Sequence, residues 1–97
     1  MKYEISWLNQ ASSELEDIRS YIEQFDPIAA QKLVNQILKH VRKLEELPYL
    51  GQLDDVVPEL RFIVVKPNYS VYYQVEEEKQ TVFIAHVWHS ARDKRSI

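Results

Sequence analysis

Histidine and arginine side chains in the second half of the chain are the groups best suited to chemistry: Arg61, His86, His89 and Arg92. An imidazole titrates near neutral pH and can act as a general acid or base. A guanidinium can hold a phosphate through two parallel hydrogen bonds. These groups therefore suit metal-free cleavage of a phosphodiester, in which a base takes a hydroxyl proton and cations stabilise the developing charge.

A metal site is not expected from the two neighbouring histidines. His86 and His89 are three residues apart, and in a strand this spacing places two side chains on opposite faces. The chain has no cysteine, and no acidic cluster near the histidines completes a set of ligands. Nucleotide-binding and zinc-protease motifs are also absent from the sequence. We therefore expect neither a metal nor a small-molecule cofactor.

One irregularity in the last predicted strand bears on where His89 points. In a regular strand, Val82 and Ile84 would point to one face of the sheet and Val87 to the opposite face. A β-bulge near residues 85–86 would place all three on the core face. His89 would then point towards the helices at the edge of the core, where it serves either a structural hydrogen bond or a functional role.

The candidate catalytic residues are Arg61, His89 and Arg92. Arg61 begins the first of three predicted strands and Arg92 follows the last, so we expect these positions to meet at one edge of the sheet. Tyr72 or Tyr73 could add a phenol to such a site. The alternative is that the tyrosines simply pack in the sheet, as aromatic strand residues usually do.

Two helices are expected to support these strands. Apolar residues recur every three or four positions across residues 8–25, which predicts an amphipathic helix with Asn9 as its cap and a solvated acidic face. Asp26 and Pro27 then suit the cap and first turn of a second helix. Pro48 follows as a stop signal, and the short connection predicts an antiparallel helical hairpin.

The strand pattern completes the fold prediction. A short strand is expected at residues 3–8, and three more at residues 60–66, 69–76 and 81–89 with short connections. The order β-α-α-β-β-β predicts an α+β fold, a two-layer sandwich in which the helical hairpin packs on a mainly antiparallel four-stranded sheet. A length of 97 residues suits one domain, residues 1–97.

Composition limits the cellular setting and the partners. No apolar run approaches the roughly 20 residues that span a bilayer, and the N-terminal segment lacks the features of a secretory signal. The expected location is the cytoplasm, with no membrane partner. A formal net charge of −3 is unfavourable for binding a phosphate backbone.

Motifs along nearly the whole chain carry a resemblance to a known superfamily. They are Trp7, Ala11, Leu15 and Ile18, then Pro27, "LPYLG" at 47–51, "LRFIVV" at 60–65, "YSVYYQV" at 69–75 and "VFIAHVWHSARD" at 82–93. In order and spacing they resemble the RelE/ParE superfamily of toxins from bacterial type II toxin–antitoxin systems. The resemblance implies a toxin that inhibits bacterial growth and is neutralised by a cognate antitoxin protein.

The resemblance leaves the cellular target open between two branches. RelE-like members cut mRNA in the ribosome without a metal, and ParE-like members inhibit DNA gyrase. The ending "VWHSARD" at 87–93, the position of Arg61 and the net acidity are closer to the ParE-like, plasmid-stabilisation branch, which we favour. The alternatives are a RelE-like endoribonuclease using Arg61, His89 and Arg92, or a non-toxic relative that only binds its antitoxin. The chain is an enzyme only in the RelE-like case.

Overall fold

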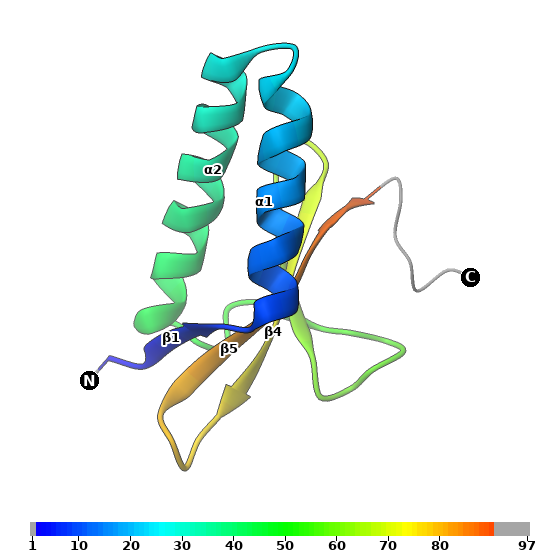
Figure 1. Cartoon of the computed structure of the whole chain (residues 1–97). Coiled ribbons are helices and arrows are strands. Elements are labelled where there is room, and N and C mark those ends of the chain that lie inside the picture. The colour runs from blue at the N-terminus through cyan, green and yellow to red at the C-terminus, as the bar shows by residue number, and fades with distance from the viewer. Residues whose placement is uncertain (1, 91–97) are drawn as a thin grey trace.

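The computed structural model describes residues 2–90, which form one sheet and a helical hairpin (Figure 1). The elements in chain order are β1 (Glu4–Trp7), α1 (Asn9–Glu23), α2 (Pro27–Arg42), a 3-10 turn η1 (Lys43–Glu45), β2 (Gln52–Leu53), β3 (Arg61–Val65), β4 (Tyr69–Glu76) and β5 (Thr81–His89). This arrangement confirms the predicted α+β class with helices on one side of a mostly antiparallel sheet.

The sheet is mixed, with strand order β1-β5-β4-β3-β2. β1 runs parallel to β5, and the other neighbours are antiparallel. The prediction of four strands was therefore one short, because β2 pairs with Arg61 and Phe62 through Gln52 and Leu53. A strand of two exposed residues has too few positions to show an alternating pattern, so its sequence does not reveal it.

The helical hairpin packs along one face of the sheet (Figure 1). As predicted, Asp26 caps α2: its Oδ1 accepts a hydrogen bond of 3.0 Å from the Ala29 amide, and Pro27 is the first helical residue. The cap predicted at Asn9 was wrong, because Asn9 is already helical and Leu8 precedes α1 with an extended backbone. Neither helix is long and apolar enough to cross a membrane.

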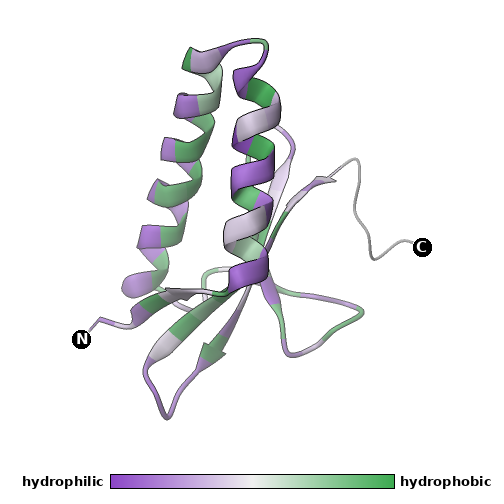
Figure 2. Ribbon diagram, viewed as in Figure 1, coloured by the Kyte–Doolittle hydropathy of each residue, from purple (hydrophilic) through white to green (hydrophobic). Residues whose placement is uncertain are grey.

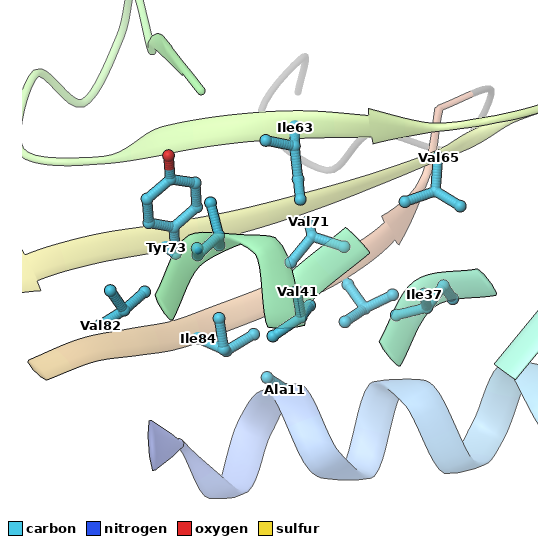
Figure 3. Packing of buried hydrophobic residues seen from close by; sticks show 11 residues of the cluster. Ala11, Ile37, Val41, Ile63, Val65, Val71, Tyr73, Val82 and Ile84 are labelled. Atoms are coloured by element: carbon cyan, nitrogen blue, oxygen red, sulfur yellow. The ribbon is translucent and has the colours of Figure 1, made fainter. Parts of the chain in front are cut away.

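The hydrophobic core lies between the hairpin and the sheet (Figure 3). Along both helices, green apolar residues alternate with purple polar residues, as expected for helices with one buried face (Figure 2). The predicted β-bulge is present: Tyr72 pairs with His86 whereas Tyr73 pairs with Ile84, so Ala85 is the extra residue of β5. The bulge brings three aliphatic side chains of β5, 0 to 1% exposed, onto the core face: Val82, Ile84 and Val87.

Candidate functional site

Arg61 holds the loop before β2 in place. Its Nη1 donates hydrogen bonds to the backbone oxygens of Gly51, at 2.8 Å, and Tyr49, at 3.4 Å. The guanidinium carbon also lies 4.9 Å from the centroid of the Tyr49 ring, a cation–π geometry. The side chain is half-buried, so this predicted catalytic residue already has a structural task.

The Tyr73 phenol belongs to the same arrangement. Its oxygen accepts a 2.8 Å hydrogen bond from the Gly51 amide, and the side chain is fully buried. Burial raises the pKa of Tyr73 above its ordinary value, against the opposing effects of the Gly51 amide and the Arg61 charge. The phenol therefore stays neutral and holds the loop rather than donating to a substrate.

His89 lies at the far end of β5. It pairs with Tyr69 of β4, and the two rings meet edge to face with centroids 5.1 Å apart. His89 lies two residues after buried Val87, so both side chains point to the same face of the sheet. This is the helix side, as expected from the bulge. Tyr69 also lines a small cleft with residues of α1.

The predicted meeting of Arg61 with the end of the last strand was wrong. Arg61 pairs with Tyr73, whereas His89 pairs with Tyr69, which in turn pairs with Val65 at the other end of β3. Strand direction alternates in an antiparallel meander, so β3 and β5 run in the same direction. The start of β3 therefore lies beside the start of β5 and not beside its end. Four residues along β3 separate the two positions by roughly 13 Å, and two strand spacings add roughly 10 Å across the sheet. Arg92 lies outside the described residues.

Glu14 is the centre of a polar cluster that the sequence pattern does not predict. Its Oε1 accepts a 2.9 Å hydrogen bond from the Val87 amide, and its Oε2 accepts one of 2.7 Å from the indole Nε1 of Trp88. The Nδ1 of His86 lies 3.3 Å from both carboxylate oxygens. The Glu14 side chain is only 11% exposed, so this helix acid belongs to the helix–sheet interface and not to the solvated face predicted for it.

The position of Glu14 follows from the sheet topology. β1 ends at Trp7 opposite Ile84, and beyond this point α1 passes beside β5 in place of a strand. The Val87 amide therefore needs an acceptor that is not in the sheet, and the Glu14 carboxylate provides it. The signal in the sequence was spacing, because Glu14 lies three residues after buried Ala11 and four before Ile18, on the apolar stripe.

Hydrogen bonding also sets the charge state of this cluster. Burial alone would raise the pKa of Glu14, but hydrogen bonds from the Val87 amide and the neighbouring polar side chains outweigh it. The pKa of Glu14 is therefore lowered, and the group is a carboxylate at neutral pH. Among the described residues no three His, Asp or Glu side chains gather into a set that could hold a metal ion.

An aromatic row covers part of the sheet face opposite the helices. Phe62 and Tyr72 have ring centroids 5.5 Å apart, and Tyr72 and Trp88 are 5.1 Å apart. The His86 ring stacks on Trp88 at 4.3 Å. Tyr72, the middle ring of this row, is only 3% exposed, and Phe62, His86 and Trp88 are half-buried, so these rings pack mainly against one another.

Comparison with known proteins places this fold in a family. The model of the ParE toxin of type II toxin–antitoxin systems, parDE, matches residues 5–94. Toxin RelE2 of Caulobacter vibrioides is 35% identical over 89 residues, which cover 92% of this chain and 97% of the relative.

Solved structures that share the fold include two toxin–antitoxin systems. The structure described as the chromosomal ParDE toxin–antitoxin system from P. aeruginosa superposes with a TM-score of 0.78 at 20% identity, covering 91% of this chain and 96% of that one. The toxin fold in the intact E. coli RelBE toxin–antitoxin complex superposes with a TM-score of 0.64 at 22% identity, covering 90% and 95%. The family match over residues 5–94 and the relative at 35% identity show that the chain belongs to the ParE toxin family, within the RelE/ParE superfamily of type II toxin–antitoxin systems.

Proposed function

We propose that this toxin inhibits bacterial growth by binding DNA gyrase, in the manner of ParE-like members, and that it does not cut RNA. The observation that carries the proposal is the separation of Arg61 from His89 across the sheet. Cleavage of a phosphodiester needs an acid, a base and cations within hydrogen-bond reach of one phosphate. The two described candidates are too far apart to meet at one.

The environments of the candidate groups support the same choice. Arg61 is engaged by the loop at Tyr49 and Gly51, the Tyr73 phenol is buried, and His86 faces the Glu14 carboxylate. The net charge of −3 is also unfavourable for a protein that must enter the ribosome and grip RNA.

The relative named Toxin RelE2 favours a second candidate function, a ribosome-dependent mRNA endoribonuclease that needs no metal. In that case the catalytic residues are Arg61, His89 and Arg92, and the two that are described must come together by a rearrangement on the ribosome. A third candidate is a non-toxic relative that only binds its antitoxin.

Induction of the chain in bacterial cells separates the three candidates. The gyrase proposal predicts growth arrest with an SOS response, altered plasmid supercoiling and intact transcripts. Early transcript cleavage with unchanged supercoiling would contradict it and support the endoribonuclease. Normal growth with abundant folded protein would leave only the non-toxic relative.

Substitution of His89 adds a residue-level test in the same cells. His89→Gln removes the imidazole but keeps a polar side chain of similar reach. The gyrase proposal predicts unchanged growth arrest, whereas a nuclease that uses His89 as acid or base should lose on the order of a hundredfold or more in cleavage rate. Circular dichroism confirms that the variant is folded.

A cognate antitoxin is the second partner that we propose, acting with the toxin in the cytoplasm. The proposal is supported by the similarity of this fold to the P. aeruginosa and E. coli structures, which are described as toxin–antitoxin assemblies. A short neighbouring reading frame whose product restores growth during induction would bear out this partner. A toxic chain that no neighbouring product neutralises would contradict it.

A further inference from the structure

A small cleft lies between the C-terminal half of α1 and the start of β4, two segments that pass close to each other in Figure 1. It has a volume of about 160 Å³ and is lined by Asp17, Ile18, Tyr21 and Tyr69. Asp17 and Tyr21 are four residues apart on α1, so their side chains lie on one face of the helix. Ile18 and Tyr69 are partly buried against the hydrophobic core, which holds both sides of the cleft in place.

Exposed aromatic rings extend from this cleft towards the tip of the hairpin. Tyr21 is 60% exposed and Phe25 is 72% exposed. The two rings meet edge to face with centroids 5.4 Å apart. The face of an aromatic ring carries partial negative charge and attracts a cation as well as apolar groups. The cleft therefore offers ring surface to a partner that is both apolar and cationic.

The charge of Asp17 is not neutralised by its neighbours on α1. Arg19, the one basic residue of this helix, is engaged by Glu16 and Glu23. Glu14 is engaged at the helix–sheet interface. Within residues 2–90, Asp17 forms no hydrogen bond or ion pair, and its side chain is exposed. The cleft thus places an unpaired carboxylate next to a tyrosine ring.

The electrostatic field of α1 also favours a cation. This helix contains four acidic residues and one basic residue, so its formal charge equals the −3 of the whole chain. Arginine matches such a site, because its planar guanidinium stacks on a tyrosine ring and donates two hydrogen bonds to a carboxylate. A second copy of the chain is disfavoured as the occupant, since it would present the same acidic helix.

We propose that this cleft, which we call the α1–β4 cleft, receives an arginine side chain of the protein target. The guanidinium stacks on the Tyr21 ring and donates to the Asp17 carboxylate, and apolar neighbours of the arginine contact Phe25. The identity of the target rests on the proposed inhibition of gyrase. The chemistry of the cleft does not, so it can be tested on the isolated chain.

Nuclear magnetic resonance titration of the isolated chain tests this cleft with two synthetic peptides. One carries an arginine between two leucines, and the other carries citrulline, which has nearly the same shape without the charge, in place of the arginine. The proposal predicts amide shift changes centred on Asp17, Tyr21 and Tyr69, and roughly fivefold to tenfold weaker binding of the citrulline peptide. Shifts elsewhere, no shifts, or equal binding of both peptides would overturn the proposal.

Two matched pairs of variants sharpen the titration. Asp17→Asn should reduce the affinity for the arginine peptide to that for the citrulline peptide. Asp55→Asn removes the same charge from the exposed loop between β2 and β3 and should change little. Tyr21→Leu removes the ring and should weaken binding, whereas Tyr21→Phe keeps the ring and should retain it. Equal behaviour within both pairs would overturn the assignment.

The C-terminal residues of the chain itself are the alternative occupant, because β5 ends at His89, whose ring contacts Tyr69. The test replaces the three basic residues of this segment by glutamine in the full chain: Arg92, Lys94 and Arg95. The proposal predicts unchanged amide resonances around Asp17 without peptide, and unchanged affinity for the arginine peptide. Shifted resonances there, together with tighter peptide binding, would assign the cleft to the chain's own segment and overturn the proposal.

Supercoiling assays separate a failure of the cleft from a failure of the target. If the natural chain inhibits gyrase, Asp17→Asn and Tyr21→Leu should each raise the concentration for half-inhibition roughly fivefold, and Asp55→Asn should not. Unchanged inhibition by the first two variants keeps gyrase as the target and overturns the role of the cleft. A natural chain that leaves gyrase active loses the gyrase proposal, whereas binding of the arginine peptide that depends on Asp17 would still support the cleft.

Discussion

At the scale of single residues, Glu14 performs a task that sheets usually leave to a neighbouring strand. Its carboxylate satisfies the Val87 amide where β1 has ended and also fixes the Trp88 indole. We predict that Glu14→Ala lowers the free energy of unfolding by about 2 kcal/mol, because it leaves a half-buried amide and an indole without this acceptor. Urea denaturation measures the loss. Glu16→Gln, on the exposed face of α1, is the control and should cost much less.

The same carboxylate makes stability depend on pH. The folded-state pKa of Glu14 lies below its ordinary value of 4.5, so folding favours the charged form. Its contribution is therefore complete above about pH 4.5 and is lost as the pH falls through the folded-state pKa. We predict that the stability difference between the natural chain and Glu14→Gln shrinks in this acidic range. A difference that stays constant from pH 7 to pH 3 would contradict this role.

Position 51 requires glycine because neighbouring atoms approach it closely, and not because of its backbone conformation. A Cβ at this position would lie 2.6 Å from the Phe62 oxygen and 2.7 Å from the Tyr73 hydroxyl. We predict that Gly51→Ala lowers the free energy of unfolding by about 2 kcal/mol, because neither backbone nor buried phenol can move away freely. Thermal unfolding compared with Gln52→Ala, an exposed neighbour, measures this effect. Equal melting temperatures would show that the loop tolerates the added methyl group.

At the scale of elements, the start of α2 depends on a local hydrogen bond. We predict that Asp26→Ala destabilises the chain by about 1 kcal/mol, since the Ala29 amide loses its side-chain acceptor. Asp26→Asn retains an acceptor oxygen and should cost only a fraction of this. Urea denaturation of both variants distinguishes capping from a general effect of removing charge. If only the charge matters, both variants should lose the same free energy of unfolding.

Most elements of the fold follow from local patterns that the sequence contains. The two helices, the long strands, the Asp26 cap and the bulge at Ala85 were all predictable, because each depends on residues close together in the chain. The β2 strand was not, because two residues show no alternation. Glu14 looked like a surface acid since its partner, Val87, is 73 positions away.

The candidate site shows the same limit. Residue types suggested Arg61 and His89 as candidate catalytic groups, but the separation of the two is a property of strand direction in the sheet. The engagement of Arg61 by Gly51 and Tyr49 depends on a loop whose path no periodic pattern records. Their catalytic roles stay predictions that the cellular and His89→Gln tests address.

At the scale of the whole molecule, the distribution of charge bears on which class of partner, RNA or protein, the chain can bind. The net charge of −3 disfavours an RNA backbone, whereas the acidic helix α1 favours a basic protein segment. The net charge therefore favours the proposed binding of a protein target over cleavage of RNA.

The most direct test of this account is a supercoiling assay with purified protein. Gyrase, relaxed plasmid and ATP are incubated with increasing amounts of the folded chain, and a parallel reaction holds translating ribosomes with a defined mRNA. The account predicts that supercoiling falls with increasing chain while the mRNA stays intact. Full supercoiling at every concentration, together with cleavage of the ribosome-bound mRNA, would contradict it.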